Sequence, residues 1–242
     1  MLRGDLASIV VGSLFLFTGL AACAVAAIAR RPGVRIVLWL GLWSAAYGAM
    51  HLTQSTAVIA TAPRLVRRAA PDANAALSYL IIIPALLSFL ELSRGTLRVL
   101  VRAAAWLALA IAVVGIGGVI ATRPDTIARL SNNLLAAAML AVLLTIVATP
   151  PLAARYFVFR HRGVLAAGMA AFAVEALFSN VSGSLGIPHW QMLDHAGFAV
   201  LLASFGYVAV TLVFDNERRL LAVEHELAVA RRIQTAILPD GP

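Results

Sequence analysis

Seven long apolar stretches dominate this chain and restrict the folds open to it. Each has roughly the 20 residues that a helix needs to cross the hydrocarbon core of a bilayer, where backbone polar groups must be satisfied within the segment. With 62% hydrophobic and 12% charged residues, the chain has too little polar surface for a soluble domain. We therefore predict an all-α, polytopic membrane protein built as a seven-transmembrane helix bundle. The predicted spans are 6–29, 36–60, 75–92, 99–121, 134–154, 164–187 and 196–214.

Two sequence features affect where the predicted helices end: a pair of prolines in the fifth span and the run around Cys23 in the first. Pro150 and Pro151 are expected to end or kink the helix of the fifth span, because proline lacks the backbone N–H and its ring clashes with the preceding turn. The run around Cys23 has some likeness to a lipoprotein processing site, but the apolar stretch continues past it to Ala29. We interpret this stretch as a retained first helix.

The arginines orient the bundle, because basic residues in short loops are retained on the cytoplasmic side. An outside N-terminus and a cytoplasmic C-terminus place most of them inside. We interpret the cluster at Arg64, Arg67 and Arg68, which breaks the rule, as a solvated or headgroup-contacting loop. The predicted location is a bacterial inner (plasma) membrane, crossed several times. The arginines left outside are Arg3, Arg64, Arg67, Arg68, Arg123 and Arg129.

Charge and composition exclude two classes of function. The net charge of +8 is spread over loop ends instead of one face of a folded domain, so we predict no nucleic-acid partner. The chain contains no lysine, which excludes the Schiff base of a retinal protein.

Polar residues inside two spans indicate where a ligand site lies. Glu175 is 11 residues into the span that starts at 164, about 16 Å along a helix and close to mid-bilayer. A carboxyl at that depth must be protonated or paired, and either state can respond to a ligand or to pH. On the second span, Ser44, Tyr47, His51 and Gln54 share one helix face.

We predict that these two faces line a small polar ligand pocket, closed on the outer side by loop residues. His51 is the candidate partner of Glu175. Helix packing alone is the alternative, and it is the preferred reading for Ser44, Ser179 and Ser182. No catalytic residue and no metal site is predicted, because the spacing of Asp194 and His195 matches no metal motif. The predicted ligand-binding residues are Glu175, His51, Gln54, Tyr47, Asn180, Trp190, Asp194 and His195.

Residues 215–242 form a predicted cytoplasmic coiled-coil linker that continues the last span. Apolar and small residues recur there at alternating steps of three and four, the spacing of a left-handed coiled coil, with charges of both signs between them. We predict a parallel homodimer. A single amphipathic helix on the anionic inner leaflet is the alternative. The predicted seam consists of Val213, Asn216, Leu220, Val223, Leu227, Ala230, Gln234 and Ile237.

The end of this helix adds a resemblance. The run ELAVARRIQTAILP, from Glu226 to Pro239, resembles the lead-in EL-x-x-AR-x-IQ-x-x-x-LP that precedes the catalytic domain of sporulation-stage-II-type (PPM-like) bacterial protein serine/threonine phosphatases. Residues 1–214 resemble, more loosely, the sensor domain of bacterial seven-transmembrane receptors with diverse intracellular signalling modules. The first resemblance implies a metal-dependent phosphatase domain beyond Pro242, with aspartates that bind manganese or magnesium.

We therefore expect a membrane sensor or receptor that signals through a dimeric coiled coil to a phosphatase domain not present in this chain. The resemblance implies that the output domain dephosphorylates a phosphorylated regulatory protein. The expected partners of the chain itself are membrane lipid, a second copy and an unknown small ligand, and no cofactor is expected within it. The alternatives are a small-solute transporter or channel, or a sensor coupled to a kinase or cyclase.

Overall fold

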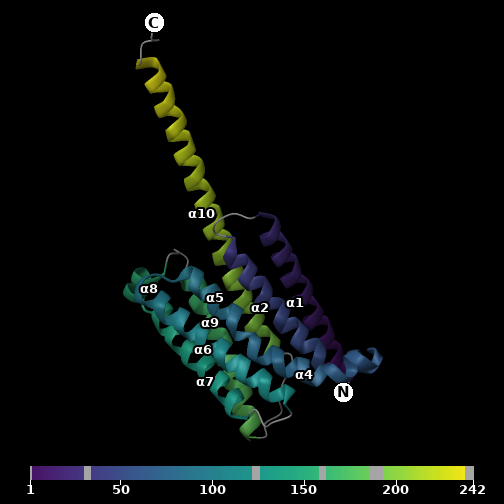
Figure 1. Ribbon diagram of the computed structural model, residues 1–242. Coiled ribbons are helices and arrows are strands. Elements are labelled where there is room, and N and C mark those ends of the chain that lie inside the picture. The colour runs from purple at the N-terminus through teal and green to yellow at the C-terminus, as the bar shows by residue number, and fades with distance from the viewer. Residues whose placement is uncertain (1, 30–33, 122–125, 158–161, 186–192, 238–242) are drawn as a thin grey trace.

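The computed structural model describes residues 2–29, 34–121, 126–157, 162–185 and 193–237 (Figure 1). Within these ranges the chain forms ten helices and no strand. An all-helical fold is thereby confirmed. The helices are α1 Leu2–Ala29, α2 Arg35–Gln54, α3 Thr56–Thr61, α4 Arg64–Leu80, α5 Ile82–Leu92, α6 Gly95–Ile120, α7 Thr126–Ala148, α8 Pro150–Tyr156, α9 Arg162–Leu185 and α10 Leu193–Ile237.

Length and apolarity make six of the described helical segments candidate membrane spans. The chain is therefore a membrane protein by the character of its helices. The predicted sixth span, 164–187, corresponds to α9, which is not among the six, so the count of seven stays a prediction. The candidate spans are Ser8–Ala29, Arg35–Gln54, Arg64–Leu92, Gly95–Ile120, Thr126–Ala148 and His195–Gln234.

The second span is shorter than the sequence suggested. It was predicted to reach Ala60, whereas α2 ends at Gln54 and Ser55 adopts an extended backbone, with ψ of 121°. The carboxylate of Asp5 accepts hydrogen bonds from the hydroxyl of Ser55 at 2.9 Å and from the N–H of Ala57 at 2.9 Å. The carboxylate therefore caps the start of α3, where the first N–H groups have no partner within the helix.

Prolines explain two further interruptions. In a regular helix the ring of Pro84 would clash with the carbonyl of Leu80, four residues earlier, and Ile81 separates α4 from α5. The third span was predicted to begin at 75, but its helix starts at Arg64. Pro150 opens α8 after α7 ends at Ala148, so the predicted break in the fifth span is confirmed.

Neighbouring helices close a ring. Helix α2 contacts α5, α5 contacts α6, α6 contacts α7, α7 contacts α9 and α9 contacts α10. Helix α10 in turn contacts α2, which closes the ring. Helix α1 packs against the outside of α2 (Figure 1). There a side chain at Gly48 would meet the backbone of α1, since its Cβ would lie 2.5 Å from the Gly12 carbonyl oxygen. Small residues thus allow the two backbones to approach closely.

The centre of the ring is aromatic and aliphatic. Phe205 of α10 is fully buried. Its ring meets Trp43 of α2 at 5.7 Å and Phe89 of α5 at 4.6 Å between centroids, both edge to face. Edge-to-face rings stabilise each other by about 0.5–1.5 kcal/mol beyond their burial. This contact fixes α10 to two other helices at one level of the bundle.

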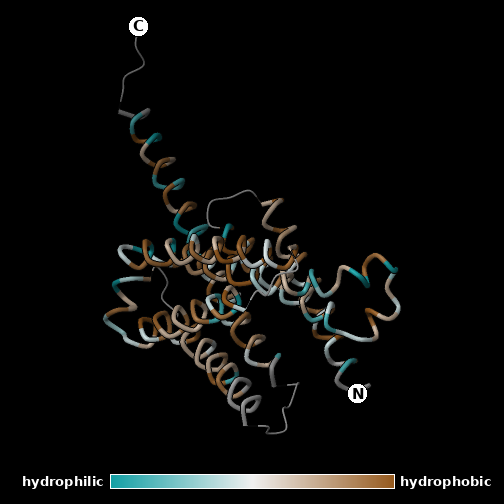
Figure 2. The backbone as a smooth tube through the Cα atoms, turned by 60° about the horizontal axis from the view of Figure 1, so that its bottom comes forward, coloured by the Kyte–Doolittle hydropathy of each residue, from teal (hydrophilic) through white to brown (hydrophobic). Residues whose placement is uncertain are grey.

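Helix α10 leaves the bundle without a break. It runs for 45 residues from Leu193 to Ile237, a length of about 67 Å against a hydrocarbon core of about 30 Å. The described side chains from Arg218 to Gln234 are all exposed. Figure 2 shows hydrophilic and hydrophobic residues alternating along this extension.

Candidate functional site

Four rings join α2 to α10 at one end of the bundle. Tyr47 and His51 lie one helical turn apart on α2, and His195 and Phe198 lie in the first turns of α10. Tyr47 stacks on Phe198, with centroids 3.6 Å apart and planes 14° apart. The rings of His51 and His195 meet edge to face at 4.4 Å, and Tyr47 meets His51 at the same distance. Three of the predicted site residues are therefore brought together by the fold.

Glu175 lies against the same stretch of α10, from α9. A Cβ built on Gly197 would lie 2.8 Å from the Cβ of Glu175 and would overlap its Oε2. The absence of a side chain at Gly197 therefore provides the space that this carboxyl occupies. His195 and Gly197 are two residues apart. The His51 imidazole and the Glu175 carboxyl therefore both contact the first turns of α10. The pairing of Glu175 with His51 stays a prediction.

The other predicted residues are more dispersed. Gln54 is exposed, and its side-chain amide donates to Asn74 Oδ1 at 3.2 Å, outside the ring cluster. Asn180 is within α9 and Asp194 within α10, but their side chains lie outside the described part of the structure, as does Trp190 entirely. Ser44 donates to the carbonyl of Phe15 on α1 at 2.8 Å, as expected of a residue that holds helices together.

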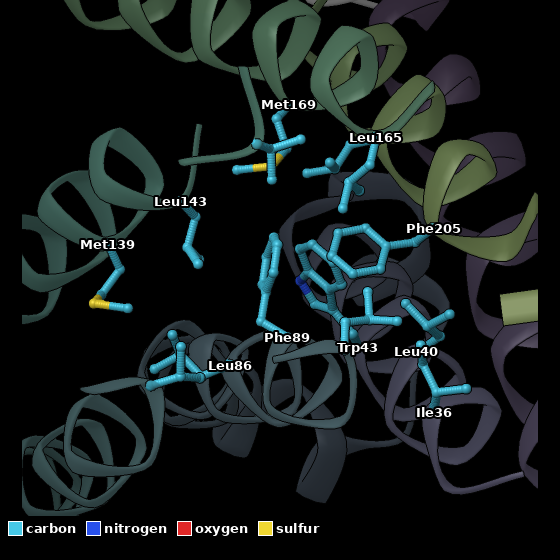
Figure 3. Close-up of a cluster of buried hydrophobic side chains, with 14 of the residues drawn as sticks. Ile36, Leu40, Trp43, Leu86, Phe89, Met139, Leu143, Leu165, Met169 and Phe205 are labelled. Atoms are coloured by element: carbon cyan, nitrogen blue, oxygen red, sulfur yellow. The ribbon is translucent and has the colours of Figure 1, made fainter. Parts of the chain in front are cut away.

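A cavity of about 240 Å³ adjoins the ring cluster. Tyr47 and Phe198 belong to both, and Tyr47 is the one predicted ligand residue among those that line the cavity. The predicted polar pocket thus differs from the cavity found, whose wall is apolar. Figure 3 shows part of that wall, including Trp43, Leu86, Phe89, Met139, Leu143 and Met169.

Sequence reasoning missed this cavity for a physical reason. An apolar side chain inside a span has the same sequence signature whether it touches lipid, another helix or an internal void. The polar stripes drew attention instead, because polar groups in a membrane are costly. One signal was present: Met50, Met139 and Met169 all line the cavity, and methionine commonly fills irregular spaces.

A second hollow runs along the outside of the bundle between α1, α2 and α10, with a volume of about 380 Å³. Its α10 wall includes Ala199, Leu202, Gly206 and Ala209. These residues are spaced by three, four and three, and four more residues lead to Val213, the first residue of the predicted seam. The residues of α10 in the groove and those of the predicted seam therefore follow the same spacing of three and four.

The predicted seam itself is largely open to solvent in the single chain. Leu220 is 59% exposed, Val223 51% and Leu227 55%. Val213 and Asn216 are half-buried at the base of the extension, while Ala230 and Gln234 are exposed. Ile237 ends α10, and its side chain is not described. Leu221, Val229 and Ile233, on other faces of the extension, are exposed as well.

The described residues contain no group of three or more histidine, cysteine, aspartate or glutamate side chains placed to hold a metal ion. No protein family, curated protein or solved structure matches the chain. The fold and the site define an all-helical membrane protein with an internal apolar cavity and a long helix leaving the bundle.

Proposed function

We propose that this chain is the membrane sensor module of a signalling protein, and that α10 transmits its state to an output domain. The observation that carries this proposal is the continuity of α10 from His195, in the ring cluster, to Ile237 at the end of the extension. A helix without a break can pass a shift or rotation along its length. A disordered joint near Phe214 would not.

Both parts of the candidate site act on this helix. Phe198 and Leu201 of α10 line the internal cavity, and Gly197 receives Glu175 from α9. A change in cavity occupancy, or in the charge of the carboxyl, therefore alters contacts that α10 makes in the bundle. Such differential contacts are what a stimulus needs to shift an equilibrium between two arrangements.

The proposal includes a parallel homodimer through the seam of α10. Its support is the exposed row of Leu220, Val223 and Leu227 and the unbroken spacing from that row back to the groove beside α1. Asn216, Ala230 and Gln234 occupy seam positions with polar or small side chains, which weakens a coiled coil. A weak coiled coil suits an element that changes register.

The proposed output is a protein serine/threonine phosphatase encoded beyond Pro242, on the strength of the run from Glu226 to Pro239. Manganese or magnesium would serve that domain, and its substrate would be a phosphorylated regulatory protein. The proposed location is a bacterial inner membrane with the N-terminus outside. The full-length gene product, assayed for manganese-dependent release of phosphate from phosphoserine peptides, tests the output; kinase or cyclase activity instead would contradict it.

Cysteine crosslinking in membranes tests the dimer. In a Cys23→Ala background, single substitutions Leu220→Cys, Val223→Cys and Leu227→Cys are expected to give disulfide-linked dimers under mild oxidation. Matched controls on the opposite face of the helix are Ala222→Cys, His225→Cys and Val229→Cys, which are expected to crosslink weakly. Equal crosslinking on both faces, or none at the three seam positions, would reject the parallel dimer.

A further inference from the structure

We infer that the cavity inside the helix ring is the sensor's ligand site, and that it takes a small, uncharged, apolar molecule of about one or two aromatic rings. This inference rests on the proposed sensory function and names the class of ligand. The cavity lies between α2, α5, α7, α9 and α10, and Trp43, Phe89, Met139, Met169 and Phe198 contribute to its wall.

The chemistry of the wall selects the ligand. Every residue that lines the cavity is apolar or aromatic, and none carries a formal charge. A charged or strongly polar ligand would lose its hydration there and gain at most the Tyr47 hydroxyl and the Trp43 indole N–H as side-chain hydrogen-bonding partners, at a cost of several kcal/mol. An uncharged apolar ligand loses little and gains dispersion contacts with the wall. Tyr47, at the edge shared with the histidine rings, brings the one side-chain hydroxyl of the lining.

The volume sets the size of that ligand. The cavity holds about 240 Å³. An apolar protein cavity of about 150 Å³ stays dry and binds benzene, so this one accommodates a molecule somewhat larger than a single ring. The three methionines and five aromatic side chains of the lining suit flat or irregular apolar shapes, because methionine adapts its shape and its sulfur contacts aromatic rings favourably.

The exposed part of the cavity wall indicates where a ligand enters. Ala136 of α7 lines the cavity and is also exposed at the surface of the bundle. It lies within a candidate membrane span, so a ligand that enters there comes from the lipid. A ligand that partitions into the bilayer therefore reaches the site without crossing a charged or hydrated layer.

Occupancy is linked to α10 by direct contacts. Phe198 and Leu201 lie in the cavity wall, and Phe198 stacks on Tyr47 at 3.6 Å. A ligand that fills the cavity therefore acts on Phe198, which the ring cluster also holds, and on Leu201 one turn further along α10. The cavity thus offers a lipid-soluble stimulus a route to the helix that leaves the membrane.

Heavy-atom quenching tests the site, with iodobenzene as the probe. In a protein with Trp39→Phe, Trp106→Phe and Trp190→Phe, the remaining Trp43 reports on the cavity wall. Iodobenzene is expected to quench Trp43 with a saturable component. A second protein that keeps Trp106 alone, which is 66% exposed on α6, reports on probe dissolved in the surrounding lipid and is expected to be quenched without saturation. Unsaturable quenching of both tryptophans would overturn the inference.

Filling the cavity provides the matched comparison. Ala136→Phe places a ring in the entrance and is expected to abolish the saturable component. Ala138→Phe, on the exposed side of the same helix and outside the lining, is expected to preserve it. If Ala136→Phe does not fold, Ala85→Leu fills the opposite wall and makes the same prediction. Saturable quenching that survives a folded, filled variant would overturn the site.

The same samples separate this inference from the proposed function. Crosslinking through Leu220→Cys and Val223→Cys is measured with and without iodobenzene. Saturable binding with an unchanged crosslinking pattern supports the ligand class and contradicts transmission through α10. Absence of saturable binding contradicts the ligand class and leaves the dimer, which the crosslinks report independently.

Discussion

The imidazole rings of His51 and His195 meet edge to face with their centroids 4.4 Å apart, which joins α2 to the helix that leaves the membrane. His195 is buried, and Tyr47 lies against His51 and also meets His195, with centroids 6.5 Å apart. The pair is therefore a structural link between the bundle and α10.

A double-mutant cycle measures this link. His51→Ala and His195→Ala are each expected to lower the free energy of unfolding in detergent, and their effects are expected to be non-additive by about 0.5–1.5 kcal/mol, the usual coupling of an aromatic pair. Replacement of His195 by Phe is expected to retain most of the coupling because the ring shape is kept. Strict additivity of the two alanine substitutions would contradict a direct contact.

The space opposite Glu175 gives a second prediction. Gly197→Ala is expected to destabilise the protein by about 1–3 kcal/mol, the usual cost of overpacking, because its methyl group would overlap the carboxyl of Glu175. In a Glu175→Gly background, which removes the Cβ at 2.8 Å as well as the carboxyl, the same substitution is expected to cost much less. Unfolding titrations of the four proteins measure the difference. An equal cost in both backgrounds would show that another neighbour sets the penalty.

Gly95, the first residue of α6, gives a third prediction. Gly95 has a φ of +61°, in the left-handed region, and a Cβ there would meet nothing within 4 Å. Gly95→Ala is therefore expected to cost about 1–2 kcal/mol from backbone conformation alone, and Gly95→Asn less, since asparagine tolerates this region. Gly117→Ala, at an open position within α6, is the control and is expected to be neutral or slightly stabilising.

The tie between Asp5 and α3 gives a prediction about pH. The hydroxyl of Thr56 contributes most to holding the pKa of Asp5 below its ordinary value, against the opposing effect of desolvation, and Ala57 and Ser55 add to the lowering. The ionised form is thus the stabilised one. Its contribution is complete above the ordinary aspartate pKa of about 3.9 and is lost as the pH falls through the lowered value in the folded protein.

Comparison with Asp5→Asn measures that contribution. The midpoint of thermal unfolding of the parent protein is expected to exceed that of the variant at neutral pH, and the gap is expected to close as the pH falls below the ordinary aspartate range. Asp72→Asn, a substitution on the exposed side of α4, controls for general loss of charge. A gap that stays constant down to low pH would mean that the carboxylate charge is not what holds the start of α3.

The helices were predictable where local chemistry decides them. The apolar runs predicted every described helix of span length, and Pro150 marked the break between α7 and α8. The end of α2 was not predictable in this way, because it depends on Asp5, about 50 residues earlier in the chain. The run from Thr53 to Thr56 is polar, but apolar residues resume at Ala57, and this let the predicted span continue to Ala60.

The candidate site was predictable in part. The stripe on α2 identified Tyr47 and His51, and the place of Glu175 in the predicted span 164–187 drew attention to α9, because polar groups in a membrane are costly. Which residues they meet depends on how distant helices pack. Gly197 carries no side chain to reveal its contact with Glu175, and nothing in the sequence separates the residues that line the internal cavity from those that face lipid.

The rings around Phe205 make α10 a lever. Trp43 and Phe89 hold it at one level of the bundle, and the helix continues 32 residues further to Ile237, about 48 Å at 1.5 Å per residue. A tilt of about 3° around that fulcrum therefore displaces the far end by roughly 2.5 Å. A sub-ångström adjustment beside Phe198 would therefore move the far end of α10 by about half a helical turn.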